Sequence, residues 1–128
     1  MQETPTPFRN MEFYFHELDH DVLVLSADGG LNAQTATQFV GELERLIEQG
    51  TSKIIVDCSH LDYISSYGIG VLIRLHKNLA KRGGDVKLTG IHSIVISVLR
   101  TAKIDQLFEI YNDIDAARLA FRPKDEPP

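Results

Sequence analysis

The stretch Asp57–Leu79, DCSHLDYISSYGIGVLIRLHKNL, decides how this chain folds. The apolar run Lys53–Asp57 leads into it and predicts a buried strand. A short polar loop follows, and the pair Ser65 and Ser66 then opens a helix. A serine at a helix start offers its side-chain oxygen to unpaired backbone N–H groups, so either serine can be the N-cap.

The predicted helix has an apolar side and a basic side. Its apolar residues recur at core-facing helical spacing: Ile69, Leu72, Ile73, Leu75 and Leu79. The opposite stripe carries Arg74, Lys77 and Lys81, with Arg82 beyond it. One interpretation is a solvated face, with cations favoured near a helix C-terminus. The other is a surface that pairs with an acidic partner.

Gly68 and Gly70 in the first turns of this helix call for a separate explanation. A glycine inside a helix costs about 1 kcal/mol relative to alanine. One compensation is tight packing of the helix start against its own sheet. The other is close approach of a ligand or of a second backbone.

The rest of the chain predicts strands that alternate with helices. Expected elements are a hairpin of 12–18 and 22–27, a turn at 28–30, a helix of 33–48 capped by Asn32, a strand of 86–89, a helix opening at His92 or Ser93, a strand of 107–110 and a helix capped by Asp113 or Asp115. This order predicts an α/β fold with right-handed crossovers. Segments 28–32 and 59–66 then leave strands at their carboxyl ends, where open sheets present ligands.

Length and composition fit a single domain. The 128 residues divide into a lead-in at 1–10, a domain at 11–122 and a tail at 123–128. The net charge of −5 argues against general affinity for nucleic acid or anionic membranes. No apolar run predicts a signal segment or membrane insertion. Cys58 is the one cysteine; it reads as a small core residue in a reducing cytoplasm.

Several enzyme chemistries lack their full motifs. Ser66 is followed by Gly68 but preceded by Ile64, so the nucleophile elbow of a serine hydrolase is incomplete. His16 and His20 lie four apart across a strand and a turn, which does not converge metal ligands. Asp28-Gly29-Gly30 lacks the lysine and spacing of a phosphate-binding loop. The sequence therefore predicts neither an enzyme nor a metal or cofactor site.

Four motifs resemble a known family. Tyr63–Leu72, YISSYGIGVL, is similar to the loop signature of STAS domains of the bacterial anti-sigma factor antagonist type. Gly29–Ala36 and Ile55–Ser59 resemble two further family motifs, and Gly83-Gly84 is similar to the family's helix-ending glycine pair. The resemblance covers roughly residues 12 to 122 and implies a mixed sheet of four to five strands with about four helices.

The resemblance also implies a function. Ser66 falls on the serine that an anti-sigma factor kinase phosphorylates in those proteins, so we expect partner switching with such a kinase and a serine phosphatase as partners. The expected partner-binding residues surround that serine: Asn32, Ser65, Ser66, Tyr67, Gly68, Ile69, Arg74 and Lys77. The oligomeric state is left open.

Three positions depart from the family pattern. Ser65 stands where the family usually has Asp, Tyr67 where it has a second Ser, and Asn32 where an acidic residue is common. The loop thus lacks two carboxylates that could help a kinase to orient the hydroxyl. The alternative is therefore a non-switching STAS scaffold or accessory subunit of a signalling assembly or lipid-transport complex.

Overall fold

A five-stranded sheet forms the centre of the molecule. The computed structural model describes residues 12–18 and 22–121, so the predicted lead-in at 1–10 and tail at 123–128 lie outside the described residues. The sheet order is β1-β2-β3-β4-β5. The element bounds are β1 Glu12–Leu18, β2 Val22–Leu31, α1 Ala33–Glu48, β3 Lys53–Ile64, α2 Ser66–Lys81, β4 Asp85–Thr89, α3 Ser93–Thr101, β5 Glu109–Tyr111 and α4 Ile114–Ala120.

The strand directions confirm the predicted α/β order. β1 pairs with β2 in an antiparallel hairpin register, and β2, β3, β4 and β5 are mutually parallel. Each parallel step is joined by a helix, as a crossover connection requires. The sheet is therefore mixed, with its parallel part carrying the helices.

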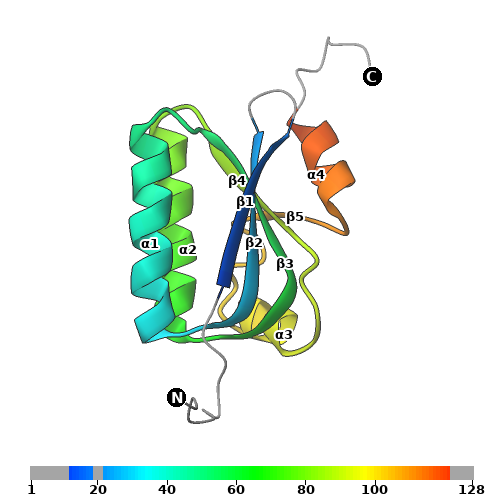
Figure 1. Cartoon of the computed structure of the whole chain (residues 1–128). Coiled ribbons are helices and arrows are strands. Elements are labelled where there is room, and N and C mark those ends of the chain that lie inside the picture. The colour runs from blue at the N-terminus through cyan, green and yellow to red at the C-terminus, as the bar shows by residue number, and fades with distance from the viewer. Residues whose placement is uncertain (1–11, 19–21, 122–128) are drawn as a thin grey trace, which may run out of the picture.

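Helices cover both faces of the sheet. Figure 1 shows α1 and α2 side by side against one face and α4 on the other. The larger core contains Phe39 of α1, Leu75 of α2 and Leu99 of α3, packed with Leu25 and Val56 of the sheet. A smaller core on the α4 side is formed by Val22, Val24, Ile55 and Ala117. Alternation along β2 and β3 sends neighbouring residues to opposite cores.

Two strands run further than the sequence predicted. Segment 28–30 was expected to be a turn and 59–64 a polar loop, but β2 continues to Leu31 and β3 to Ile64. The pairing survives because register shifts near Ser26 and between Gly29 and Gly30 absorb the irregular stretch. Leu31 and Ile64 are both buried, so their apolar side chains hold the extension in the core. The last strand was also shifted: it is Glu109–Tyr111 rather than 107–110.

Candidate functional site

The starts of α1 and α2 lie side by side at the carboxyl edge of the sheet. Leu31 and Ile64 are partners in the last rung between β2 and β3, and a helix cap follows each of them. The N–H of Ser65 donates to the carbonyl oxygen of Leu31 at 2.8 Å, which ties the second cap to the first strand. The sheet therefore brings Asn32 and Ser65 together, as the order of strands and helices predicted.

Asn32 caps α1 as predicted. Its Oδ1 accepts from the N–H groups of Gln34 and Thr35 at 2.9 and 3.0 Å. The Oγ1 of Thr35 in turn accepts from the Asn32 N–H at 3.0 Å, which completes a reciprocal capping box. The neutral amide therefore does the capping at a position where the family often has an acid.

The two adjacent serines have different roles. Ser65 is the N-cap of α2, and its Oγ accepts from the Gly68 N–H at 3.1 Å. Ser66 is the first residue of the helix and is exposed. Within residues 12–18 and 22–121 its hydroxyl has no hydrogen-bond partner. The choice that the sequence left open is thus resolved: Ser65 stabilises the helix, and Ser66 is the accessible hydroxyl.

The two glycines also differ. A Cβ on Gly68 would lie 2.8 Å from the Leu31 carbonyl oxygen and 3.0 Å from Cγ1 of Ile64, so this glycine is required by packing against the sheet. A Cβ on Gly70 would meet none of the described residues beyond its own turn of helix within 4 Å, and Gly70 is exposed. Packing against the sheet therefore explains Gly68. It does not explain Gly70, where glycine lowers the helix propensity and no contact among the described residues requires it.

An exposed line of residues runs down α2 from the free serine. We call it the α2 stripe; its members follow one another at spacings of one helical turn and are all exposed: Ser66, Gly70, Arg74, Lys77 and Lys81. α2 contains no Asp or Glu. In the part of the chain that the structure describes, the three cations of the stripe form no ion pair. The stripe is thus a basic surface on a protein whose net charge is −5.

Aromatic side chains flank the serines. Tyr63 at the end of β3 is 39% exposed and Tyr67 in the first turn of α2 is 49% exposed. Ile69 is half-buried against the larger core. Tyrosine is enriched at protein–protein interfaces, so two exposed tyrosines beside an accessible hydroxyl are consistent with a binding surface. Gly68, another predicted site residue, is buried.

The acidic, cysteine and histidine side chains of this part of the chain lie in different environments. Neither α1 nor α2 has an acidic residue in its first turn. Cys58 is buried, and burial together with nearby Asp57 raises its pKa to about 12, so its thiol is inert. His60 is exposed and lies 3.3 Å from the Ser59 hydroxyl. Among the described residues, no three His, Cys, Asp or Glu side chains form a metal site.

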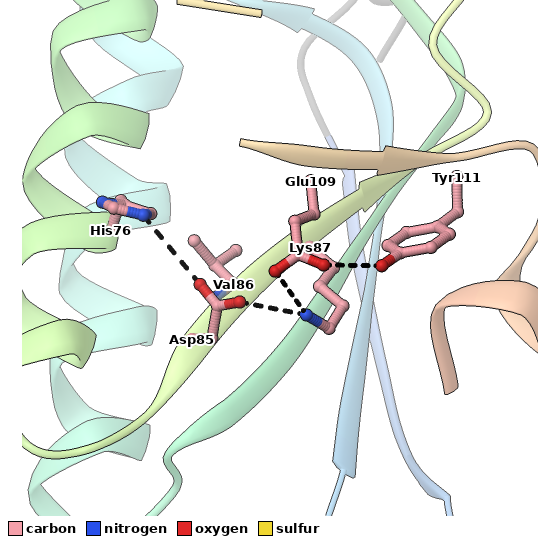
Figure 2. Close-up of polar contacts among 6 residues, drawn as sticks. All are labelled: His76, Asp85, Val86, Lys87, Glu109 and Tyr111. Atoms are coloured by element: carbon pink, nitrogen blue, oxygen red, sulfur yellow. Dashed lines mark hydrogen bonds and ion pairs between the residues drawn. The ribbon is translucent and has the colours of Figure 1, made fainter. Parts of the chain in front are cut away.

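A charged cluster around one buried lysine, on the face of the sheet that α4 covers, was not predicted from the sequence; its two carboxylates are partly exposed. Lys87 of β4 is 4% exposed, and its Nζ lies 3.0 Å from Asp85 Oδ2 and 3.1 Å from Glu109 Oε2 (Figure 2). The ring of Phe121, at the end of α4, lies 4.5 Å from the same nitrogen. Strict alternation along Val86-Lys87-Leu88 was the available signal, because it points Lys87 away from its apolar neighbours.

The hydrogen bonds of this cluster shift two pKa values. The Tyr111 hydroxyl donates to Glu109 Oε1 at 2.6 Å. This hydrogen bond, followed by that from Lys87, lowers the pKa of Glu109. The same hydrogen bond, with a smaller contribution from burial, raises the pKa of Tyr111 to about 12. Figure 2 also shows His76 of α2 facing Asp85, at 3.9 Å. The cluster joins β4, β5 and α4 through contacts within the domain, so we regard it as structural.

Fold and site together define a small sheet domain with an accessible serine at a helix start. The STAS domain model matches residues 16–117, and the chain therefore belongs to the STAS domain family. The resemblance seen in the motifs is confirmed. No helix among the described residues combines the length and apolar character needed to cross a membrane.

Several relatives of the chain are described as anti-sigma factor antagonists. BtrV of Bordetella bronchiseptica is 29% identical over 101 residues, which cover 79% of this chain and 87% of BtrV. The crystal structure of a Thermotoga maritima protein of the same description superposes with a TM-score of 0.80 at 26% identity, covering 87% of this chain and 95% of that one. SpoIIAA of Bacillus in its phosphorylated form shares the fold, with a TM-score of 0.68 at 17% identity over 85% of this chain and 99% of that one.

Proposed function

We propose that this chain is an anti-sigma factor antagonist that switches partners through phosphorylation of Ser66. In the unmodified state the Ser66 edge and the α2 stripe bind an anti-sigma factor kinase in the cytoplasm, which releases the sigma factor or another client. The kinase transfers a phosphoryl group from ATP to Ser66, and a serine phosphatase removes it. The chain itself acts as a binding protein and a phosphoacceptor, without catalysis or a cofactor.

The accessibility of the Ser66 hydroxyl is the observation that carries this proposal. Ser65 already caps α2, so Ser66 can be modified without the loss of a structural hydrogen bond. A kinase must place the attacking hydroxyl in line with the γ-phosphorus of ATP, and a buried or bonded hydroxyl could not reach that position. The location at the start of α2 adds a place for the product, because helix N-termini favour anions.

The charge of the phosphate explains how modification would change the partner. Phosphorylation adds about −1.5 to −2 charges at pH 7. In the free domain this charge meets solvent and the positive end of α2, and no acidic residue in the first turn repels it. Inside a desolvated interface the same charge would lack compensation. Each 1.4 kcal/mol of that penalty weakens the complex about tenfold, so a local modification becomes a choice of partner.

Phosphorylation by a purified anti-sigma factor kinase of the same organism tests the proposal. We expect incubation with this kinase and ATP to add a single phosphoryl group, detected by intact-mass spectrometry. The modification should be lost in Ser66→Ala and kept in Ser65→Ala, which is the matched control one residue away. Ser66→Asp should bind the kinase more weakly than the wild type in calorimetry. An unmodified wild type, together with undiminished binding by Ser66→Asp, would exclude the switch.

A non-switching scaffold is the second candidate. The observation in its favour is that Asn32 and Ser65 cap the two helices without a carboxylate, so the loop lacks two acids that could orient the hydroxyl for a kinase. A scaffold would bind its partner equally well whether position 66 carries a serine, an alanine or an aspartate. Equal affinities for wild type, Ser66→Ala and Ser66→Asp would therefore select this alternative.

A further inference from the structure

We infer that the partner segment lying along α2 is an acidic helix whose backbone comes closest to α2 at Gly70; this inference rests on the proposed function. It specifies the chemistry and the position of the contact, which the proposed function leaves open. The observations that carry it are the open space at Gly70, the charge of the α2 stripe and the opposite charge of α1.

Gly70 lies where a second backbone can approach. It is exposed, it follows Ser66 by one helical turn, and a Cβ there would meet no described residue within 4 Å apart from its own turn of helix. The separation of two packed helices depends on the side chains at their crossing point, so a missing side chain allows the axes to come closer. On the α2 stripe Gly70 is the single position without a side chain, and it separates Ser66 from the cations.

The charge of the stripe selects the chemistry of the partner. Beyond Gly70 the stripe presents Arg74, Lys77 and Lys81 at spacings of three and four residues, and α2 has no acidic residue to neutralise them. Carboxylates on one face of a helix recur at the same spacing, so a partner helix running along α2 can meet each cation in turn. Complementary charges of this kind raise the rate and the specificity of association.

The neighbouring helix α1 confines this acidic partner to α2. Glu44 and Glu48 are exposed on α1, and Glu42 is already paired with Arg45 at 2.8 Å. The narrow apolar groove between the two helices has Glu44 on the α1 side and Arg74 on the α2 side. A carboxylate that shifted from α2 toward α1 would meet like charge, and such repulsion fixes the register of a partner.

Substitutions at Gly70 and at Gly41 test the close approach. Gly41 is the matched control, because it is an exposed glycine in the middle of α1 whose added Cβ also meets nothing within 4 Å. Alanine at either position should raise the midpoint of thermal unfolding by a few degrees, since both replace a helical glycine. Gly70→Leu should weaken binding to the purified anti-sigma factor kinase about tenfold or more, while Gly41→Leu stays within about twofold of the wild type.

Charge reversal tests the acidic character of the partner. Arg74→Glu with Lys77→Glu should weaken kinase binding about tenfold or more at low salt, and the loss should shrink as salt rises. The control pair Arg100→Glu with Lys103→Glu changes the net charge equally, at exposed positions near the end of α3 and just after it. Equal effects of the two pairs would mean that only net charge matters and would overturn this part of the inference.

A cross-linker at position 70 tests whether the partner segment is a helix. Cys58 is buried with a raised pKa, so in a Gly70→Cys variant a thiol-reactive photo-cross-linker reaches the new cysteine alone. Mass spectrometry of the photolysed kinase complex should locate the cross-link in a helix with carboxylates spaced one turn apart. A cross-link to a loop, a strand or a basic helix would overturn the inference.

The outcomes separate this inference from the proposed function. Suppose that the wild type binds the kinase and that Ser66→Asp weakens this binding. If Gly70→Leu leaves the binding unchanged, the inference fails and the switch stands. If Gly70→Leu weakens binding and Ser66→Asp does not, the acidic helix docks on α2 without a switch at Ser66. If the wild type forms no complex, the proposed function fails first, and the inference is abandoned with it.

Discussion

Positive charge is treated in opposite ways in two regions of the molecule. Lys87 is buried, and it is compensated by two carboxylates and an aromatic ring. On the α2 stripe, Arg74 and Lys77 are exposed and have no ion-pair partner within the described residues. A buried cation must be compensated within the domain, whereas an exposed one can remain available for another molecule.

The same contrast recurs at the start of α2. Ser65 is partly buried and Gly68 is buried, and both make contacts within the domain. Ser66 and Gly70 are exposed, and the described residues leave both without such a contact. Ser65 and Gly68 thus stabilise the start of α2, whereas the proposed binding involves Ser66 and Gly70, so substitutions can separate the two properties.

Removing both carboxylates beside Lys87 should cause the greatest loss of stability. In Asp85→Ala with Glu109→Ala, a nearly buried ammonium loses both carboxylates, so we expect the free energy of unfolding to fall by about 3 to 5 kcal/mol. Urea unfolding followed by circular dichroism measures this loss. The control Glu42→Ala with Glu44→Ala removes the same charge from α1 and should change stability by less than about 1 kcal/mol. Adding Lys87→Met to the first variant should restore part of the loss; no recovery would show that charge burial is not its cause.

The next effect tests the packing at Gly68. The added methyl group of Gly68→Ala would lie 2.8 Å from the Leu31 carbonyl oxygen and 2.9 Å from Leu31 Cγ, so the helix start must shift. Overpacking of this kind costs about 1 to 3 kcal/mol, which urea unfolding can measure. Gly70→Ala has the opposite sign in the same assay, at about 1 kcal/mol more stable. Two glycines with effects of the same sign would contradict the assignment of their roles.

A smaller change in stability is expected to distinguish the capping role of Ser65 from the exposed Ser66. Ser65→Ala removes the N-cap of α2 and leaves the Gly68 N–H without its acceptor, at a cost of about 1 kcal/mol. Ser66→Ala should change the free energy of unfolding by less than about 0.5 kcal/mol, because its hydroxyl is exposed. Thermal unfolding of both variants beside the wild type measures the difference. A loss in Ser66→Ala equal to that in Ser65→Ala would show that Ser66 shares in capping.

The smallest effect is the pH dependence contributed by Glu109. Its pKa in the folded state lies below 4.5, chiefly because Tyr111 donates a hydrogen bond to it and then because of Lys87. A lowered folded-state pKa contributes stability that is present above the unfolded value and lost as the pH falls through the folded one. The stability difference between wild type and Glu109→Gln should therefore shrink below about pH 4.5. A difference that stays constant in urea unfolding down to about pH 3 would refute the linkage.

Much of the site could be predicted because its signals are local. Asn32 precedes an amphipathic segment, and the Ser65-Ser66 pair precedes another, so both caps are readable from a few neighbouring residues. The choice between Ser65 and Ser66 was not readable, because either hydroxyl can reach an N–H in the first turn. The true length of β2 was hidden as well: Gly29-Gly30 is typical of a turn, and only pairing with β3 keeps it extended.

The Lys87 cluster could not be assembled from the sequence. Asp85 is two residues away, but Glu109 and Phe121 are far along the chain and approach Lys87 only when β5 pairs with β4 and α4 covers the sheet. Alternation in β4 predicts on which side of the sheet the Lys87 side chain lies, but it does not predict which residues contact that side chain. Partners brought together by tertiary structure are therefore the part that a local pattern does not contain.

The unequal lengths of the outer strands have a consequence for self-association. At one side of the described sheet β5 offers three residues, and at the other β1 offers seven. An incoming strand gains backbone hydrogen bonds in proportion to the length of the edge on which it adds, so β5 is a poor template for β-strand addition. If copies of this chain aggregate through their sheets on heating, the first such contact is expected along β1.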